Sequence, residues 1–176
     1  MKSTILTGRA WVIRDSSGKP INDIDTDMIF HNKWLAITKL EEMGLHTFGN
    51  LPEWAEFPQK VQQGDILVVG TNFGAGSSRQ QAVDCFTALG VSLIIGESFG
   101  AIYKRNAINS GLPLMTVSDV MDVLEPIKSG DQLEVNLKTG EIKNLTKNKI
   151  ISGNPLAKVQ LDIYQAGNLF NYGKTL

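Results

Sequence analysis

A glycine-rich segment, residues 70–79, lies between an apolar run and a stretch with helical apolar spacing. The apolar run at 66–69 predicts a buried strand, and residues 78–89 predict a helix that ends at Gly90. The three glycines of the segment let the backbone turn tightly and come close to a ligand. Strand, tight turn and helix in this order are typical of a parallel sheet with crossover helices, and no other feature restricts the fold as strongly.

The same alternation continues to about residue 116, whereas the C-terminal third contains a predicted hairpin around Lys138, Thr139 and Gly140. We therefore predict an α/β fold, a single domain over residues 1–176 with a mixed sheet of parallel βαβ units and added antiparallel strands. The predicted strands cover 5–13, 66–69, 92–95, 112–116, 132–137 and 141–145, and the predicted helices cover 35–43, 78–89, 99–110 and 155–166.

The composition excludes several classes of protein. An apolar fraction of 42 % and a charged fraction of 20 % are those of an ordinary soluble globular protein. The net charge of −1 gives no reason to expect nucleic acid or a membrane surface as a partner. No apolar run approaches the roughly 18 residues that a membrane-spanning helix needs, and the first residues lack an apolar signal core. We expect a cytoplasmic protein.

Cys85 is the only cysteine. A single thiol cannot form an internal disulfide, nor a zinc or iron–sulfur site that needs several thiolates. Its place in the predicted helix 78–89 indicates a small buried packing residue. We therefore expect no metal in this chain, and any iron–sulfur cluster that it works with must be held by another chain.

The glycine segment matches neither of two common nucleotide-binding motifs. Arg79 occupies the place of the third glycine of a dinucleotide fingerprint starting at Gly74 and Gly76, and no Gly-Lys-Ser/Thr ending follows. Ser77, Ser78 and Arg79 instead stand where unpaired N–H groups of a helix N-terminus attract an anion. One serine would suffice to cap the helix, so two serines and an arginine favour a carboxylate or phosphate site over capping alone.

Asp23, Asp25 and Asp27 alternate with other residues, which in an extended chain would place three carboxylates on one side. A calcium loop beginning at Asp23 would need glycine and glutamate where Met28 and Trp34 stand, so that motif is excluded. The carboxylates either accept hydrogen bonds from the backbone of a local turn, or one of them orients an arginine or serine of the glycine segment. We favour the ordering role.

Arg105 and Asn106 lie on the predicted helix 99–110. A solvated helix face is the default interpretation. Ile102 and Ile108 would hold the helix against the core and could leave Arg105 or Asn106 facing the glycine segment. Neither the histidine motif of metalloproteases nor the Gly-x-Ser-x-Gly motif of serine hydrolases is present.

Three segments taken together, residues 23–27, 72–79 and 105–113, resemble the small-subunit family of 3-isopropylmalate dehydratases, the separate-chain counterparts of the swivel domain of aconitase. The resemblance extends from about residue 8 to about residue 170. It implies a swivelling β/β/α domain that closes over a large subunit carrying a [4Fe–4S] cluster. It also implies a hydro-lyase that interconverts 2- and 3-isopropylmalate by dehydration and rehydration in leucine biosynthesis, active only with its large subunit.

In that family the first serine of the Gly-Ser-Ser-Arg motif is the catalytic base and the arginine binds a substrate carboxylate, which implies Ser77 and Arg79 here. Ser78 would add a hydrogen bond to the substrate or to the loop. Relatives often continue the motif with glutamate, whereas this chain has Gln80 and Gln81, so a carboxylate that could orient Arg79 is missing there. The supporting residues are Asp25, Asp27, Asn72, Gly74, Gly76, Arg105 and Asn106.

The resemblance places substrate selection in the loop after the acidic triplet, here Trp34, Ala36 and Ile37. Relatives that act on homoaconitate have an arginine at the place of Ala36. An apolar lining accommodates an alkyl group and leaves an extra carboxylate unpaired, which favours 3-isopropylmalate or another alkyl malate such as 2,3-dimethylmalate. Lys33 keeps a tricarboxylate, and hence homoaconitase, open. A non-catalytic carboxylate-binding domain built on the same loop is the remaining alternative.

Overall fold

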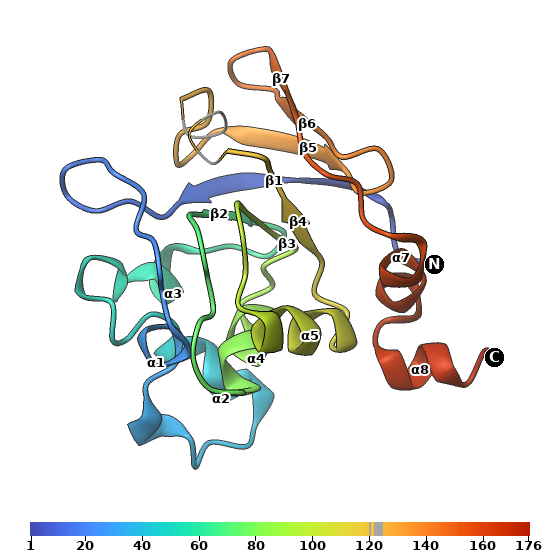
Figure 1. The fold of residues 1–176 in the computed structure, drawn as a ribbon. Helices are drawn as coiled ribbons and strands as arrows, with labels where there is room; N and C mark the ends of the chain where they lie inside the picture. Colours follow the sequence, from blue (N-terminus) through green and yellow to red (C-terminus); the bar gives the residue numbers. More distant parts are fainter. Residues whose placement is uncertain (120, 122–124) are drawn as a thin grey trace.

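The computed structural model describes residues 1–119, 121 and 125–176, and its described strands join into one mixed sheet in the order β4-β3-β2-β1-β5-β6-β7 (Figure 1). Neighbours among β1 to β4 run parallel, whereas β5 pairs antiparallel with β1, and β6 and β7 follow antiparallel. The predicted α/β class with parallel βαβ units and added antiparallel strands is confirmed. The strands are β1 Ile5–Val12, β2 Ile66–Val69, β3 Leu93–Gly96, β4 Leu114–Thr116, β5 Gln132–Asn136, β6 Glu141–Asn144 and β7 Lys149–Ser152.

The sheet folds into two layers, and helices add a third. In Figure 1 the antiparallel strands β5 to β7 lie above β1 to β4, and helices α4 and α5 lie below them. This is the β/β/α arrangement that the resemblance implied. The described helices are α1 Thr26–Ile29, α2 Leu40–Met43, α3 Phe57–Lys60, α4 Gln81–Ala88, α5 Ala101–Asn109, α7 Lys158–Ala166 and α8 Leu169–Gly173, with 3-10 turns at Asn32–Trp34, Gly44–His46 and Pro52–Trp54.

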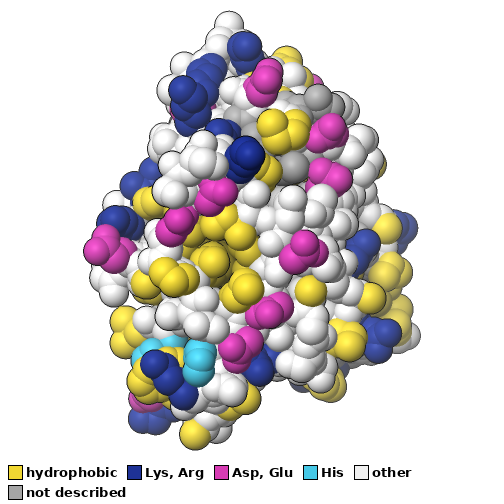
Figure 2. All heavy atoms as spheres, turned by 60° about the vertical axis from the view of Figure 1, so that its left-hand side comes forward, with side chains coloured by type: hydrophobic (Ala, Val, Ile, Leu, Met, Phe, Trp, Pro, Cys, Tyr) yellow, Lys and Arg dark blue, Asp and Glu magenta, His cyan; other side chains and the backbone are white. Residues whose placement is uncertain are grey.

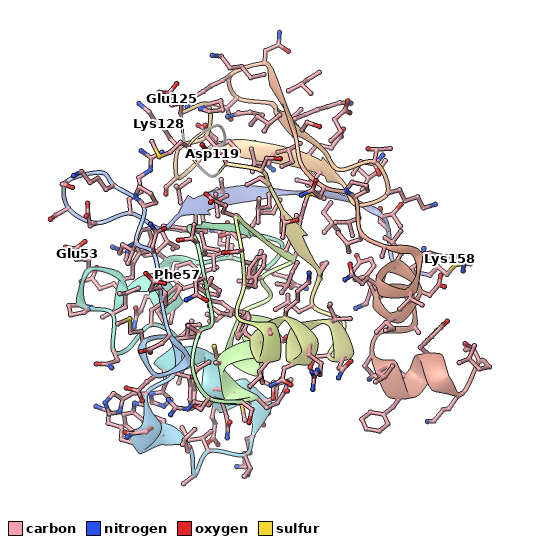
Figure 3. All side chains as sticks on the ribbon, viewed as in Figure 1. Glu53, Phe57, Asp119, Glu125, Lys128 and Lys158 are labelled. Carbon is pink, nitrogen blue, oxygen red and sulfur yellow. The ribbon has the colours of Figure 1, made fainter. Side chains whose placement is uncertain are left out.

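Each face of the parallel strands packs into its own hydrophobic core. Because successive side chains of a strand point to opposite faces, Ile66 and Val68 enter the core beneath β5 and β6, whereas Leu67 and Val69 enter the core on the helix side. Phe57 of α3 belongs to the helix-side core (Figure 3). All four strand residues are at most 1 % exposed, so β2 reads as the continuous apolar run expected of a strand covered on both faces.

Two predicted helices differ from the structure in length. Helix 78–89 begins only at Gln81, because the Arg79 amide donates to the carbonyl of Ser77 and the chain is still turning there. Helix 35–43 shrinks to Leu40–Met43. The apolar spacing before it comes from Trp34 and Ile37, which pack against the helix-side core from a 3-10 turn and a loop.

Three other expectations need correction. Strand β7 and helix α8 were not predicted from the sequence. Helix α5 is held by the buried Tyr103 and Ala107, whereas Ile102, expected to hold it, is 42 % exposed. The acidic triplet is not one extended run, since α1 begins at Thr26 and turns the chain within it.

Among the described helices, none combines the length and the apolar character required to span a lipid bilayer.

Candidate active site

The glycine loop after β2, residues 70–79, forms backbone hydrogen bonds with the chain segments on both of its sides. The Gly74 amide donates to the Ile24 carbonyl at 2.7 Å, and the Thr26 amide donates to the Ala75 carbonyl at 2.9 Å. On the other side, the Gly100 amide donates to the Phe73 carbonyl at 2.9 Å. The loop is therefore held as an irregular extra strand between the acidic segment and the start of α5.

Glycine is required at two positions where the loop packs against α5, Gly74 and Gly100. Gly74 has φ +78°, and a side chain there would run into the ring of Tyr103. A side chain at Gly100 would run into the Gly74 carbonyl. Tyr103 is buried and its hydroxyl donates to the Ala82 carbonyl in α4 at 3.1 Å, so the loop backbone lies directly on a ring that bridges two helices.

Asp23 and Asn72 form a second brace at the entrance of the loop. Both residues are left-handed, with φ +56° and +52°, a conformation that Asp and Asn tolerate better than other side chains. The Asn72 amide nitrogen Nδ2 donates to Asp23 Oδ1 at 2.9 Å, and the Asp23 backbone amide donates to the Thr71 carbonyl at 3.0 Å. Asn72 thus ties the entrance of the glycine loop to the acidic segment.

Ser77 and Ser78 are exposed at the tip of the loop. Ser77 Oγ lies 3.3 Å from Thr26 Oγ1. Capping alone does not explain these serines, because the N-cap of α4 is Gln80 and no side chain caps that helix. Gly76, with φ +96°, lets the backbone pass over Thr26. The tip therefore presents two hydroxyl groups to the outside, one of them beside the Thr26 hydroxyl.

Arg79 points from the loop to the acidic segment. Its Nη1 donates to Asp27 Oδ1 at 2.8 Å and to the Phe30 carbonyl at 2.9 Å. Neither Nε nor Nη2 has a partner among the described residues, and neither atom is buried. The side chain is only 13 % exposed, so it is fixed by packing while one edge of the guanidinium stays open to a ligand.

Asp27 is the carboxylate that orients Arg79, as the ordering hypothesis predicted. Its Oδ1 also accepts from the Asn32 backbone amide at 2.9 Å, and its Oδ2 accepts from Asn50 Nδ2 at 3.0 Å. The hydrogen bond from Arg79 is the main reason that the pKa of the Asp27 carboxyl lies below its usual value, with the Asn32 amide adding to the effect. Asp25 has a different role, because its Oδ1 accepts from the Met28 amide and caps α1.

The missing glutamate after Arg79 is explained by this arrangement. Gln80 Nε2 donates to Asp84 Oδ1 and to Ser110 Oγ, both at 2.8 Å, and so braces α4 against the end of α5. Burial raises the pKa of the Asp84 carboxyl. Since Asp27 pairs with Arg79 from across the site, no acidic residue at position 80 is needed to hold the guanidinium.

The recognition loop, residues 33–37, in which substrate selection was expected, lies beside the start of α4, where Gln81 Nε2 donates to the Leu35 carbonyl at 3.4 Å. Trp34 is stacked on the ring of His46, with centroids 4.0 Å apart, and Lys33 Nζ lies 5.0 Å from the centroid of the Trp34 ring. Ile37 is half-buried, and Ala36 is exposed. Figure 2 shows histidine side chains beside lysine or arginine at the lower left of one face, with apolar side chains gathered nearer its centre. His46 was not singled out in the sequence, because stacking between distant residues leaves no local pattern.

Arg105 and Asn106 are not brought into contact with the loop tip in the described part of the chain. Arg105 is exposed on α5, and Asn106 is half-buried. Two residues that were not predicted from the sequence do contact the site: Thr26, through the Ser77 hydroxyl, and Asn50, through the Asp27 carboxylate. Thr26 stood within the acidic triplet, but nothing local marked Asn50.

Cys85 lies in α4 and is fully buried, as predicted. Burial raises the pKa of its thiol to about 12, so the thiolate that a metal requires is disfavoured. No group of three or more potential metal-ligating side chains occurs among the described residues. The donors of this chain therefore do not fit an iron–sulfur cluster.

Comparison with known proteins identifies the family. Residues 19–119 match the aconitase C-terminal domain. The chain is 42 % identical over 171 residues to the isopropylmalate/citramalate isomerase small subunit of Methanocaldococcus jannaschii, covering 97 % of this chain and 95 % of that protein. It is 40 % identical over 163 residues to the 3-isopropylmalate dehydratase small subunit of Caldicellulosiruptor bescii, covering 93 % and 95 % of the two.

The fold is similar as well. A crystal structure described as 3-isopropylmalate dehydratase from Methanocaldococcus jannaschii superposes with a TM-score of 0.84 and 37 % identity, covering 97 % of this chain and 94 % of that one. The architecture and the domain match define an aconitase-type swivel domain. Within that class the chain belongs to the family of 3-isopropylmalate dehydratase small subunits.

Proposed function

We propose that this chain is the small subunit of a cytoplasmic hydro-lyase that interconverts 2- and 3-isopropylmalate by dehydration and rehydration, in leucine biosynthesis. One observation carries this proposal: Arg79 and the exposed Ser77 lie on the same loop, and Asp27 holds the Arg79 guanidinium so that its Nε and Nη2 edge stays open. Relatives named as small subunits support a large-subunit partner. Because this chain has a single cysteine, we assign the [4Fe–4S] cluster to that partner, where it would supply Lewis-acid chemistry toward the leaving hydroxyl.

Arg79 serves as the carboxylate clamp in this proposal. A guanidinium presents parallel N–H groups that match the two oxygens of a carboxylate, and the Nε and Nη2 edge of Arg79 has no hydrogen-bond partner among the described residues. Asp27 and the Phe30 carbonyl hold the opposite edge, so the clamp keeps its direction before substrate arrives. Binding then costs little side-chain entropy.

Ser77 serves as the base that removes the proton next to the carboxylate. Removing this proton builds negative charge on the substrate, which the nearby guanidinium of Arg79 stabilises. A serine hydroxyl is a weak base, and the Thr26 hydroxyl, 3.3 Å from Ser77 Oγ, can donate a hydrogen bond that favours the ionised serine. Ser78, exposed beside it, is assigned a hydrogen bond to substrate.

The recognition loop favours a substrate with an alkyl group. Ala36 offers no cation, and Lys33 lies over the Trp34 ring, which reduces its availability for a third carboxylate. The name of the Methanocaldococcus jannaschii relative includes citramalate, so a methyl-substituted malate belongs among the substrates to be tested. Homoaconitate and 2,3-dimethylmalate remain the comparison substrates.

The central test is coexpression with the large subunit and an assay on 3-isopropylmalate. Ser77→Ala is expected to lower kcat by about 100-fold or more, because a positioned base contributes at least that factor. Ser152→Ala, at an exposed serine ending β7, is the matched control and should keep full activity. Full activity of Ser77→Ala would refute the assigned base, and an inactive wild-type complex with loaded cluster would refute the proposed reaction.

Substrate choice is tested by Ala36→Arg. The new cation would meet a third carboxylate, so the ratio of kcat/KM for homoaconitate to that for 3-isopropylmalate should rise by about tenfold or more. Leu145→Arg, at a half-exposed leucine after β6, controls for the added charge. An unchanged ratio would mean that Ala36 does not face the substrate.

A further inference from the structure

Asn50 stands 23 residues from Asp27 in the sequence, yet its Nδ2 donates to Asp27 Oδ2 at 3.0 Å. The other oxygen, Oδ1, is already shared by Arg79 and the Asn32 amide. Each carboxylate oxygen therefore has a fixed partner, and Asn50 is the side chain that prevents the carboxylate from rotating away from Arg79. We propose that Asn50 is a positioning residue for Arg79, acting through Asp27.

The backbone that presents Asn50 supports this assignment. Phe48 has φ +59°, which is strained for a bulky side chain and persists only where the surroundings hold it. Its ring is fully buried and makes edge contacts with Phe57, Phe73 and Phe86, at centroid distances of 5.4 to 6.5 Å. The helix-side core thus holds the turn that carries Asn50.

The same turn is tied to α1. The Phe48 amide donates to the Ile29 carbonyl at 2.7 Å, and the Leu51 amide donates back to the Phe48 carbonyl at 3.0 Å. Because Asp27 lies on α1 as well, this bond fixes the distance between Asn50 and Asp27 through the backbone. Asn50 is thus an exposed asparagine on a turn whose ends, Phe48 and Leu51, are buried, and the contact that it makes leads to Arg79 through Asp27.

The part of this inference that concerns substrate binding rests on the proposed function. One of the experiments below, an NMR measurement on the isolated chain, does not depend on that function. In the complex with the large subunit, Asn50→Ala should raise KM for 3-isopropylmalate by about threefold to tenfold with kcat changed less, as expected for losing one hydrogen bond to a charged group. Asn154→Ala is the matched control, since Asn154 is also exposed and its Nδ2 donates to Thr116 Oγ1 at 2.9 Å, which joins the segment after β7 to the end of β4 rather than to Asp27. Its KM should stay at the wild-type value.

Asn50→Asp gives a signature that a merely structural residue would not produce. At neutral pH its carboxylate would face that of Asp27 without a donor, whereas at lower pH the protonated group could again donate to Asp27. The KM of this variant relative to wild type should therefore recover as the pH falls from 8 to about 5.5, close to the upper range of a carboxyl beside another carboxylate. A ratio that does not depend on pH, together with an unchanged KM for Asn50→Ala, would overturn the proposal.

The arm independent of activity uses the full-length chain alone. The Nε–Hε NMR signal of Arg79, assigned by its loss in Arg79→Lys, should broaden or shift in Asn50→Ala and stay unchanged in Asn154→Ala. An undisturbed Arg79 signal in Asn50→Ala would refute the positioning role even if the complex is active. If the wild-type complex does not convert isopropylmalate but the signal responds, the proposed reaction fails and the positioning role stands.

Discussion

Asp65 and Asp27 accept the same three kinds of hydrogen bond, yet Asp65 is buried in the fold, whereas Asp27 orients Arg79 at the candidate site. Asp65 Oδ2 accepts from Arg9 Nη2 at 2.8 Å, from Trp11 Nε1 at 2.7 Å and from the Gln62 amide at 2.8 Å. Asp27 likewise accepts from an arginine, a side-chain nitrogen and a backbone amide. The two carboxylates differ in exposure: the side chain of Asp65 is 5 % exposed and that of Asp27 is 37 % exposed.

The two arginines complete the contrast. Arg9 also donates to the Lys60 carbonyl through the same Nη2. Among the described residues neither its Nε nor its Nη1 has a hydrogen-bond partner, and of these two atoms only Nε is buried. Arg79 likewise has two nitrogens, Nε and Nη2, without a partner in the described part of the chain, and neither of them is buried. Accessible unpartnered donors and an arginine–aspartate pair occur at both places, so neither by itself distinguishes structure from function. What differs is that Arg79 lies on the loop that exposes Ser77.

The largest expected effect separates the two arginines by activity. Arg79→Ala should lower kcat/KM of the reconstituted enzyme by about 1,000-fold, because it removes a fixed donor at the developing charge. Arg9→Ala should leave kcat/KM within about twofold and act on stability instead, since partners of Arg9 are structural. Steady-state kinetics on both variants decides, and equal losses would erase the distinction.

The next largest effect concerns the stability of the fold, where we expect the structural carboxylate, Asp65, to matter more than Asp27. Asp65→Ala removes the carboxylate that pairs with Arg9 and leaves the Trp11 Nε1–H and the Gln62 amide without their acceptor, and we expect a loss of about 3 kcal/mol in the free energy of unfolding. Asp27→Ala should cost less than about 1 kcal/mol, because the pair is partly solvated. Urea unfolding of the isolated chain measures both, and a larger loss for Asp27 would contradict the comparison.

The smallest effect is a pH dependence. The Asp27 pKa lies below its usual value in the folded state, so its ion pair contributes stability at pH above the usual carboxyl value of 3.8, and this contribution is lost as the pH falls through the lowered pKa. The melting temperatures of wild type and Asp27→Asn should therefore differ slightly at pH 6 and converge well below pH 3.8. A difference that grows on acidification would show the opposite sign and contradict the assignment.

The sequence predicted the parts of the fold that depend on neighbouring residues. The apolar run of β2, the glycine turn and the apolar spacing of α4 all lie within about 25 residues, so local pattern was enough. Strand β7 was missed because Lys149–Ser152 is mostly exposed and its pairing with β6, rather than apolar content, makes it a strand. The start of α4 was misplaced because serine residues suit both a cap and a loop.

The site was predicted on one side only. The Ser-Ser-Arg tip and the acidic segment carry local signals, and these predicted that one aspartate of the triplet orients an arginine or serine of the glycine loop. The structure identifies the pair as Asp27 and Arg79. Asn50 and His46 gave no signal, since their roles depend on contacts with Asp27 and Trp34 that only the folded chain creates. The catalytic and substrate-binding roles of the individual residues stay predictions until the variants above are measured.

The packing of the glycine loop on the Tyr103 ring has a consequence for association with a second chain. The loop is ordered by backbone bonds to Ile24 and Gly100 and by close packing on a buried ring, so its conformational entropy is lost when the chain folds. Nothing in residues 70–79 then has to become ordered when a second chain arrives. On the side of this chain, association then carries no entropy cost for ordering the loop backbone.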